Sequence, residues 1–498
     1  MIRLIKNANN YLKRRAIISD GADYSYKNLL DASEIIALHL LNSTKDLNEA
    51  RIAFIVQPGF DYVSIQWGIW RAGGIAVPLC ISHPIASIKY VIEDSQVSTI
   101  VFSREYETLI SPLHGNPELR FFCIEEFNSK SGILPIIDDN RRAMIIYTSG
   151  TTGSPKGVVS THHNIEAQIT SLIVAWEWNQ NDHILNVLPM HHVHGIVNVL
   201  CCALWIGACC EFLDKFNPEK TFNIFCKNEV NIFMAVPTIY FKLISYYNEL
   251  PGDAQQKISE SLKRFRLMVS GSAALPISIF EKWKQISGHT LLERYGMTEI
   301  GMAISNPYKG ERKAGYIGQP LPDVQIRLVD ENDLGVYEGD PGEIQIKGTN
   351  VFKEYWGKPT ETLESFTKDG WFKTGDISIF ENGSYKILGR DSVDIIKSGG
   401  YKISALEIEE VLRLHPQIKD CAVVGLPDEE WGEIIAAGLV VSDKELNLIE
   451  LTEWLKNKLP NYKTPRKYII LDDLPRNVMG KVTKKELVSL FNTESNKE

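Results

Sequence analysis

In the first part of the chain, stretches with helical spacing of hydrophobic residues alternate with short, wholly hydrophobic runs. Residues 28–41 carry the helical pattern, and residues 52–56 form the first apolar run. Residues 63–71 are helical again and lead into a second run at residues 75–79. The alternation continues as far as Tyr295 and predicts a parallel sheet with helices on both faces.

The pattern changes after Tyr316, where short strands are separated by turn residues. Residues 324–329 and 342–348 are examples of these strands. Because the connections are short, this stretch predicts a more antiparallel β region.

The C-terminal part of the chain has the pattern of a separate module. Ser404 followed by Glu407 has the sequence of a capping box that opens a helix. Apolar runs at residues 421–424 and 434–441 predict strands, and leucines in helical register predict a helix that stops at Pro460. About a hundred residues of this mixed pattern are enough for an α+β domain.

The length and composition fit a globular protein with more than one domain. At 498 residues the chain exceeds what one hydrophobic core supports. We expect an α/β fold, with a large domain at residues 1–390 made of parallel α/β subdomains and a β-rich subdomain, and a small mobile α+β domain at residues 391–498. The net charge of −9 argues against broad contact with nucleic acid or anionic membranes.

Residues 197–210 form an apolar stretch that is too short to span a membrane. Two pairs of adjacent cysteines lie inside it, and adjacent thiols lack the usual Cys-x₂-Cys arrangement, so we expect small buried hydrophobic residues rather than a zinc site. The basic N-terminus resembles a mitochondrial presequence. However, residues 16–20 already have a strand pattern, so the expected location is cytoplasmic.

A polar loop, YTSGTTGSPKG at residues 147–157, follows an apolar run at residues 143–146. Its glycines let the backbone approach a ligand closely, and its hydroxyls and Lys156 can donate to phosphate oxygens. It is not a Walker loop, because Pro155 precedes the lysine and Gly157 follows it. A flexible polar loop is the alternative, but this density of such residues after a buried strand favours phosphate binding.

This loop resembles the signature of the adenylate-forming superfamily, which includes acyl- and aryl-CoA synthetases, luciferases and peptide-synthetase adenylation domains. Similar blocks follow in the expected order and cover nearly the whole chain. They are YGMTE at 295–299, GWFKTGD at 370–376, LGR at 388–390, SGGYK at 398–402 and PRNVMGK at 475–481. The resemblance implies a ligase that activates a small carboxylic acid with ATP and Mg²⁺ and then passes the acyl group to coenzyme A.

The resemblance also implies roles for individual residues. Lys481 contacts the carboxylate and the α-phosphate, where two anions must approach each other. Glu299 and Thr152 help to place Mg²⁺. Asp376 accepts both ribose hydroxyls, and Arg390 donates to the ribose region. The leaving phosphates are held by Thr148, Ser149, Gly150, Thr151, Thr152, Gly153 and Lys156. Further residues expected to bind ATP or coenzyme A are Gly271, Ser272, Ala273, Glu293, Arg294, Tyr295, Thr298, Gly399, Gly400 and Tyr401.

The segment after Arg390 departs from the family pattern. Asp391-Ser392-Val393-Asp394 is one residue longer than the commonest hinge sequence. We therefore expect the pivot of the small domain within residues 391–393.

The histidines of LPMHHVHG at residues 188–195 have two interpretations. His192 and His194 are two residues apart and would share one face of a strand as metal ligands. The similar family has an aromatic-His-x-His-Gly sequence here, which lines the wall between the acyl pocket and the pantetheine tunnel, with His191 in the aromatic position. We favour the wall, because no acidic or cysteine residue is close by in the sequence.

Within the superfamily the chain is most similar to malonyl-CoA synthetases, through VSGSAALP at 269–276, ERYGMTEIGM at 293–302 and SVDIIK at 392–397. In that group a basic residue after Val-Pro-Thr-x-Tyr binds the distal carboxylate, and a serine and a methionine shape the pocket. The matching residues are Lys242, Ser272 and Met297, and lysine lacks the bidentate fork of the arginine usual in bacterial members. The resemblance implies malonate or methylmalonate. A solvated Lys242 and a short- or medium-chain fatty acid are the alternatives.

Other functions on the same fold are less favoured. A carrier-protein-loading adenylation enzyme would be followed by a carrier domain after Lys481, and none is expected. A luciferase-like oxygenase would emit light from an acyl adenylate. A catalytically inactive binding protein is disfavoured because each catalytic block is intact. We expect no nucleic-acid partner and no obligatory protein partner.

Overall fold

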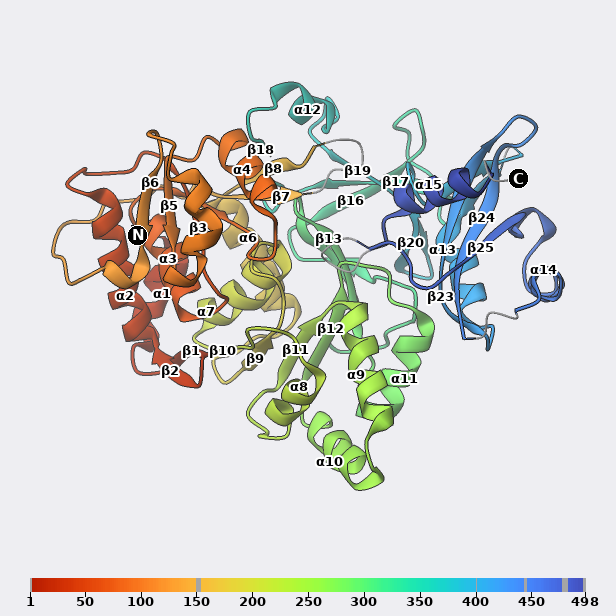
Figure 1. Cartoon of the computed structure of the whole chain (residues 1–498), viewed down its shortest axis with the longest axis horizontal. Coiled ribbons are helices and arrows are strands. Elements are labelled where there is room, and N and C mark those ends of the chain that lie inside the picture. The colour runs from red at the N-terminus through yellow and green to blue at the C-terminus, as the bar shows by residue number, and fades with distance from the viewer. Residues whose placement is uncertain (1, 149–153, 400, 443–445, 477–481, 496–498) are drawn as a thin grey trace.

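The computed structural model describes residues 2–148, 154–399, 401–442, 446–476 and 482–495. Two α/β regions come first along the chain, a β-rich region follows, and a small α+β region lies at the end of the molecule away from the N-terminus (Figure 1). The α/β fold class predicted from the sequence is confirmed.

The sheet nearest the N-terminal helices has the strand order β18-β8-β7-β4-β3-β5-β6. Its strands are β3 Arg51–Ile55, β4 Ile75–Pro78, β5 Thr99–Phe102, β6 Arg120–Cys123, β7 Arg142–Thr148, β8 Lys156–Thr161 and β18 Glu354–Tyr355. β3 to β7 pair in parallel, whereas β8 is antiparallel to both of its neighbours. The predicted apolar runs at residues 52–56 and 75–79 are therefore the buried central strands β3 and β4.

A second sheet has the order β15-β14-β13-β12-β11-β9-β10-β1-β2. Its strands are β1 Arg15–Ser19, β2 Ala22–Ser25, β9 His183–Asn186, β10 Cys209–Phe212, β11 Ile232–Ala235, β12 Leu267–Gly271, β13 Leu292–Met297, β14 Gly301–Ser305 and β15 Gln319–Pro320. The pairs from β1 to β13 are parallel, and those at the two ends are antiparallel. The carboxyl ends of β12 and β13 therefore lie at one edge, the usual place for a ligand in such a sheet.

Helices cover these sheets, and two of them pack closely. α2 Tyr26–Leu41 contacts α3 Phe60–Arg71 at Gly68, where a Cβ atom would lie 2.6 Å from Ile36 Cγ2. The other α-helices of the large part are α1 Arg3–Ala8, α4 Ile85–Asp94, α5 Glu107–Ile110, α6 His162–Ala175, α7 Cys202–Ile206, α8 Pro218–Phe225, α9 Pro237–Glu249, α10 Gly252–Leu262, α11 Ile277–Ser287 and α12 Pro359–Glu364. Both predicted helices, at residues 28–41 and 63–71, are confirmed, although each begins two or three residues earlier.

The apolar stretch 197–210 is folded into the core. It comprises most of a π-helical segment, His194–Cys201, then α7 and the start of β10, and its cysteines are buried. The disfavoured alternative, in which His192 and His194 share one face of a strand, does not hold, because His194 begins this helical segment. Across the described ranges of the chain, no helix is long and apolar enough to cross a membrane.

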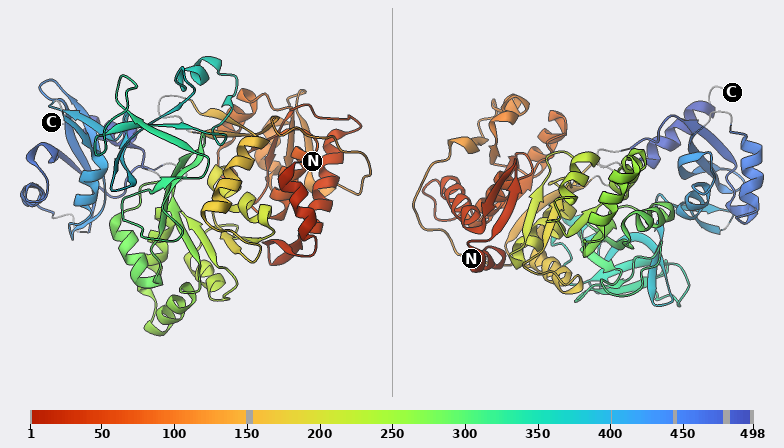
Figure 2. Two further views of the ribbon diagram at one scale, coloured as in Figure 1. Left: turned by 180° about the vertical axis from the view of Figure 1, so that it is seen from behind. Right: turned by 90° about the horizontal axis from the view of Figure 1, so that it is seen from below.

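The β-rich region is an antiparallel sheet with the order β16-β17-β19-β20, as the sequence predicted. Its strands are β16 Gln325–Val329, β17 Gly342–Lys347, β19 Phe372–Glu381 and β20 Ser384–Arg390. β20 leads directly into the small C-terminal region, and the two views of Figure 2 show that region at one end of the molecule.

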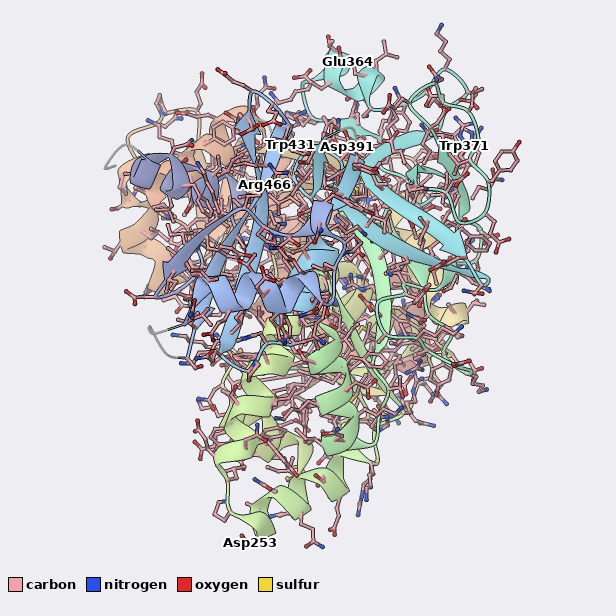
Figure 3. All side chains as sticks on the ribbon, turned by 90° about the vertical axis from the view of Figure 1, so that its right-hand side faces the viewer. Asp253, Glu364, Trp371, Asp391, Trp431 and Arg466 are labelled. Carbon is pink, nitrogen blue, oxygen red and sulfur yellow. The ribbon has the colours of Figure 1, made fainter. Side chains whose placement is uncertain are left out.

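The small region has the sheet order β22-β21-β24-β23, and β25 also pairs in parallel with β24, at residues 436–440. Its elements are β21 Ile395–Ser398, β22 Tyr401–Ser404, β23 Ile418–Asp428, β24 Gly432–Val441, β25 Lys467–Leu471, α13 Ala405–Leu412, α14 Leu448–Lys456 and α15 Lys484–Ser495. The Ser404 side chain accepts the backbone N–H of Glu407, so the predicted N-cap of α13 is confirmed. Near the start of β24, the guanidinium of Arg466 lies 3.8 Å from the ring centroid of Trp431 (Figure 3).

Candidate active site

A carboxylate on β19 is held between an arginine on the neighbouring strand β20 and a tyrosine on β13 of the other sheet. The Tyr295 hydroxyl donates to Asp376 Oδ2 at 2.6 Å, and Arg390 Nε donates to Oδ1 at 3.1 Å. Asp376 and Arg390 are opposite each other in the β19–β20 ladder, and Gly375 has a φ of +72°, which favours glycine. The structure therefore brings together three residues that the sequence assigned to the nucleotide.

The charge of this cluster is balanced by its own members. Burial raises the pKa of Asp376, whereas the Arg390 guanidinium and the Tyr295 hydroxyl act in the opposite direction. A carboxylate has lone pairs for about four hydrogen bonds. Two ribose hydroxyls can therefore donate to Asp376 while Tyr295 and Arg390 keep their present contacts.

A second carboxylate, Glu299, lies in the turn after β13 and is buried. The Tyr355 hydroxyl donates to its Oε1 at 2.9 Å. Burial raises the pKa of Glu299, so a cation beside it would favour the ionised form. Lys156 Nζ lies 5.0 Å from the centroid of the Tyr355 ring, so this tyrosine connects the lysine of the phosphate loop with Glu299. The sequence did not predict that Tyr355 contacts Glu299, because the two residues are far apart along the chain.

The phosphate loop is anchored at both of its ends. Thr148 and Lys156 are register partners where β7 ends and β8 begins. The Tyr147 hydroxyl donates to Asp94 Oδ2 at 2.6 Å, and the Tyr90 hydroxyl donates to the carbonyl of Pro155 at 2.8 Å. The other loop residues expected to bind phosphate lie outside the described residues. They are Ser149, Gly150, Thr151, Thr152 and Gly153.

A pocket cluster forms where β12 and β13 end. Ser272 has a φ of +67°, which is uncommon for a residue other than glycine. Its hydroxyl lies 3.3 Å from His194 Nδ1 and accepts from the two terminal nitrogens of Arg294 at 3.3 and 3.4 Å. At Gly271, a Cβ atom would lie 2.5 Å from Arg294 Cζ, so a side chain at this position would displace the guanidinium.

Arg294 is a buried cation, with 3% of its surface exposed. Burial lowers its pKa to about 9, and within the described residues its Nε has no hydrogen-bond partner and its guanidinium pairs with no carboxylate. A buried charge without a counter-ion is costly unless a ligand supplies one. The sequence placed Arg294 among the residues for ATP or coenzyme A and did not indicate this position beside Ser272.

Lys242 lies on the exposed side of α9, whereas Tyr240 and Leu243 face the core. An exposed ammonium is hydrated and is not the fixed cation that a dry pocket requires. The role of Lys242 at the distal carboxylate therefore stays a prediction, which this conformation does not favour. Met297 and His192 are half-buried near the same strand ends, and Ala273 is exposed.

A cysteine and two histidines meet beside the histidine-rich segment. Cys80 follows β4, His83 lies in the next turn, and His191 comes from the segment before the π-helical stretch. Burial acts to raise the pKa of the Cys80 thiol, but the neighbouring imidazoles of His191 and His83 lower it to about 5. The sequence analysis set aside a metal at His192 and His194 because no acidic or cysteine residue is close by in the sequence. The structure brings Cys80 from a distant segment to the neighbouring His191.

Part of the expected coenzyme A edge is described. Gly399 has a φ of +57°, and a Cβ atom there would lie 2.9 Å from the Trp431 ring. Tyr401 is exposed and stacks on Tyr462, with ring centroids 4.5 Å apart. Gly400 and Lys481 lie outside the described residues.

Together these features are typical of a nucleotide-dependent α/β enzyme. One carboxylate is suited to a ribose, a second is suited to a cation, and a buried arginine lies where β12 and β13 end. The chain belongs to the AMP-binding enzyme family, whose model matches residues 4–356, and the model of the AMP-binding enzyme C-terminal domain matches residues 407–481.

Curated relatives and solved structures agree with this membership. The malonate–CoA ligase ACSF3 of Xenopus laevis, named as mitochondrial, is 43% identical over 99% of this chain and 92% of its own. ATP-bound MatB from Rhodopseudomonas palustris is 30% identical over 98% of this chain and 99% of its own, with a TM-score of 0.89. A malonyl-CoA ligase with methylmalonyl-CoA and AMP bound is 32% identical over 96% and 100% of the two chains, with a TM-score of 0.70.

Proposed function

We propose that this protein is an acid–thiol ligase that uses ATP to convert malonate or methylmalonate into an acyl adenylate and then into the coenzyme A thioester. The Xenopus relative is named a malonate–CoA ligase, and one structural neighbour carries methylmalonyl-CoA and AMP. In this structure, the observation that carries the choice of acid is Arg294, a buried guanidinium beside Ser272 that pairs with no carboxylate of the described residues.

A dicarboxylic acid fits the charge of this pocket. Its distal carboxylate would pair with Arg294 and accept from the Ser272 hydroxyl, because both lie at the same strand ends. Arginine suits this role since its planar fork binds a carboxylate through two hydrogen bonds. The other carboxylate would then be held towards the α-phosphate, and Met297 would limit the size of a substituent on the α-carbon.

A different group of residues would hold the nucleotide. Asp376 would accept the ribose hydroxyls, with Arg390 keeping the carboxylate oriented. Lys481, to which the family resemblance assigns this role, would neutralise charge as the carboxylate approaches the α-phosphate. Holding both reactants in line accounts for most of the rate in such a reaction, because little other covalent chemistry is required of the protein.

The donors around Glu299 fit Mg²⁺. A buried carboxylate with a raised pKa favours a nearby cation, and Mg²⁺ prefers carboxylate oxygens together with phosphate oxygens and water. When bound, the ion would neutralise charge on the phosphates. Thr152 would contribute its hydroxyl, and Lys156 would contact the leaving phosphates.

Two positions of the small region would serve the two half-reactions. At nearly the same sequence identity, the structure is more similar to ATP-bound MatB than to the product complex, with TM-scores of 0.89 and 0.70. This contrast supports a different domain arrangement in the two states. We keep residues 391–498 as the moving domain, with its pivot within residues 391–393.

The test is a screen for AMP release from ATP with acetate, malonate, methylmalonate, succinate, butyrate and octanoate, each with and without coenzyme A. We expect the highest kcat/KM with malonate or methylmalonate and a requirement for coenzyme A for sustained turnover. Preference for butyrate or octanoate would instead identify a fatty acyl-CoA synthetase. Sustained turnover only with a carrier protein would identify a carrier-loading enzyme.

The location of the enzyme is part of the same proposal. We propose the cytoplasm, and the mitochondrion is the alternative because the Xenopus relative is named as mitochondrial. Fractionation of cells that express the tagged chain distinguishes the two.

A further inference from the structure

The cluster of Cys80, His83 and His191 has the composition and geometry of a metal site. One ligand atom from each residue lies within 4.8 Å of the other two. Cys80 and His83 are fixed relative to each other by a turn, in which the His83 N–H donates to the Cys80 carbonyl at 3.2 Å. His191 approaches from a distant segment, and its ring centroid lies 5.8 Å from that of His83.

The surroundings leave the third ligand available. His191 Nε2 is buried and has no hydrogen-bond partner in the described part of the chain. A buried imidazole nitrogen without a partner is unfavourable unless a ligand binds it. The Cys80 sulfur is buried as well, and its contact with the Ser82 hydroxyl at 3.3 Å is a weak hydrogen bond that a metal ion can replace.

The spacing fits Zn²⁺ after a small contraction. With Zn–S near 2.3 Å and Zn–N near 2.05 Å, the ligand atoms of a tetrahedral site are about 3.3–3.6 Å apart. The separations of at most 4.8 Å in this structure therefore need to shorten by no more than about 1.2–1.5 Å. Side-chain rotation of His83, which is half-buried in a turn, allows such a shift.

We propose that Cys80, His83 and His191 bind one Zn²⁺ ion, with Cys80 as the thiolate and a water molecule as the fourth ligand. A thiolate and two imidazoles are soft to intermediate ligands, which disfavours Mg²⁺ and Ca²⁺. The site is separate from the carboxylate at Glu299. The metal site does not depend on which acid the enzyme activates. A bound ion would nevertheless fix the segment of the pocket wall that contains His191, because the His191 and His192 rings are 4.0 Å apart.

The test uses the metal-free full-length protein and Co²⁺ as a spectroscopic probe for Zn²⁺. We expect a thiolate-to-cobalt charge-transfer band that saturates at one ion per chain and disappears when Zn²⁺ is added. Co²⁺ bound at Glu299 would give no such band, because that site has no sulfur. Absence of the band in the unmodified protein would overturn the proposal.

Variants assign the ligands. Cys80→Ser should abolish the band. His83→Ala should weaken Zn²⁺ binding by about 100-fold, because even the loss of a residue that only hydrogen-bonds to a metal ligand weakens metal binding by about 10- to 100-fold. Cys226→Ser is the matched control, since Cys226 is a free and partly exposed cysteine outside the cluster, and it should leave the spectrum unchanged. A band that persists in Cys80→Ser, or Zn²⁺ affinity that is unaltered in His83→Ala, would contradict the assignment. Thermal unfolding measurements show whether each variant is folded. If Cys80→Ser does not fold, the Zn²⁺ affinity of His83→Ala tests the assignment instead.

Discussion

Arg294→Met should separate malonate from an uncharged acid of similar length. The substitution removes the guanidinium but keeps most of the side-chain volume. In the structure this group is 3% exposed and donates to Ser272 at 3.3 and 3.4 Å. Truncating one partner of a buried charge pair costs about 2–5 kcal/mol. Because about 1.4 kcal/mol corresponds to tenfold, kcat/KM for malonate should fall about 30-fold to several thousand-fold.

The assay is AMP release in the presence of coenzyme A, with malonate and butyrate measured side by side. Butyrate carries no distal charge, so its kcat/KM should change little or rise, because a buried, unpaired cation no longer opposes an apolar chain. The KM for ATP and the thermal unfolding midpoint serve as checks that the nucleotide site and the fold are intact.

Lys242→Met is the matched control, because Lys242 is an exposed cation on α9. It should affect malonate by less than about threefold, in line with the small contribution of exposed charges. If both acids lose the same factor in Arg294→Met, Arg294 is structural. A selective loss of malonate in Lys242→Met, without one in Arg294→Met, would return the distal carboxylate to Lys242.

Three further outcomes are expected. Asp376→Asn should raise the KM for ATP by about 10- to 100-fold, because hydrogen bonds to a charged group contribute about 1.5–3 kcal/mol, and an unchanged KM would remove Asp376 from the ribose site. Lys481→Ala should abolish adenylate formation but leave the conversion of supplied malonyl-AMP to malonyl-CoA, and equal loss of both steps would reject this division. Ser392→Pro should slow thioester formation more than adenylation, since proline fixes φ at the proposed pivot, and unchanged partial rates would move the pivot elsewhere.

A fourth outcome concerns the dependence of stability on pH. Burial raises the pKa of Glu293 from 4.5 to about 8, so between these values the folded protein holds a proton that the unfolded chain has released. Stability should therefore fall as pH rises through this window, and Glu293→Gln should flatten the slope in urea unfolding from pH 5 to 8, whereas an unchanged slope would assign it to other groups.

The sequence by itself determined the layered α/β fold. The apolar runs at residues 52–56 and 75–79 form central parallel strands. A strand that is buried on both faces has apolar side chains at nearly every position, so its sequence is a continuous apolar run. The Ser404 cap and the antiparallel β16–β17 pair also follow from local pattern. The order of the blocks assigned Asp376 and Arg390 to the ribose region, and the structure shows that the two side chains are in contact.

Only the tertiary structure decided which side chains face each other across the pocket. It placed Lys242 in solvent and Arg294 beside Ser272, although both are cations near strand ends in the sequence. It also brought Cys80 to His191 from separate parts of the chain. The periodicity of apolar residues indicates which face of a helix or strand is buried. Which side chains from distant segments come into contact depends instead on how the sheets and loops pack together, and no single segment of the sequence specifies that packing.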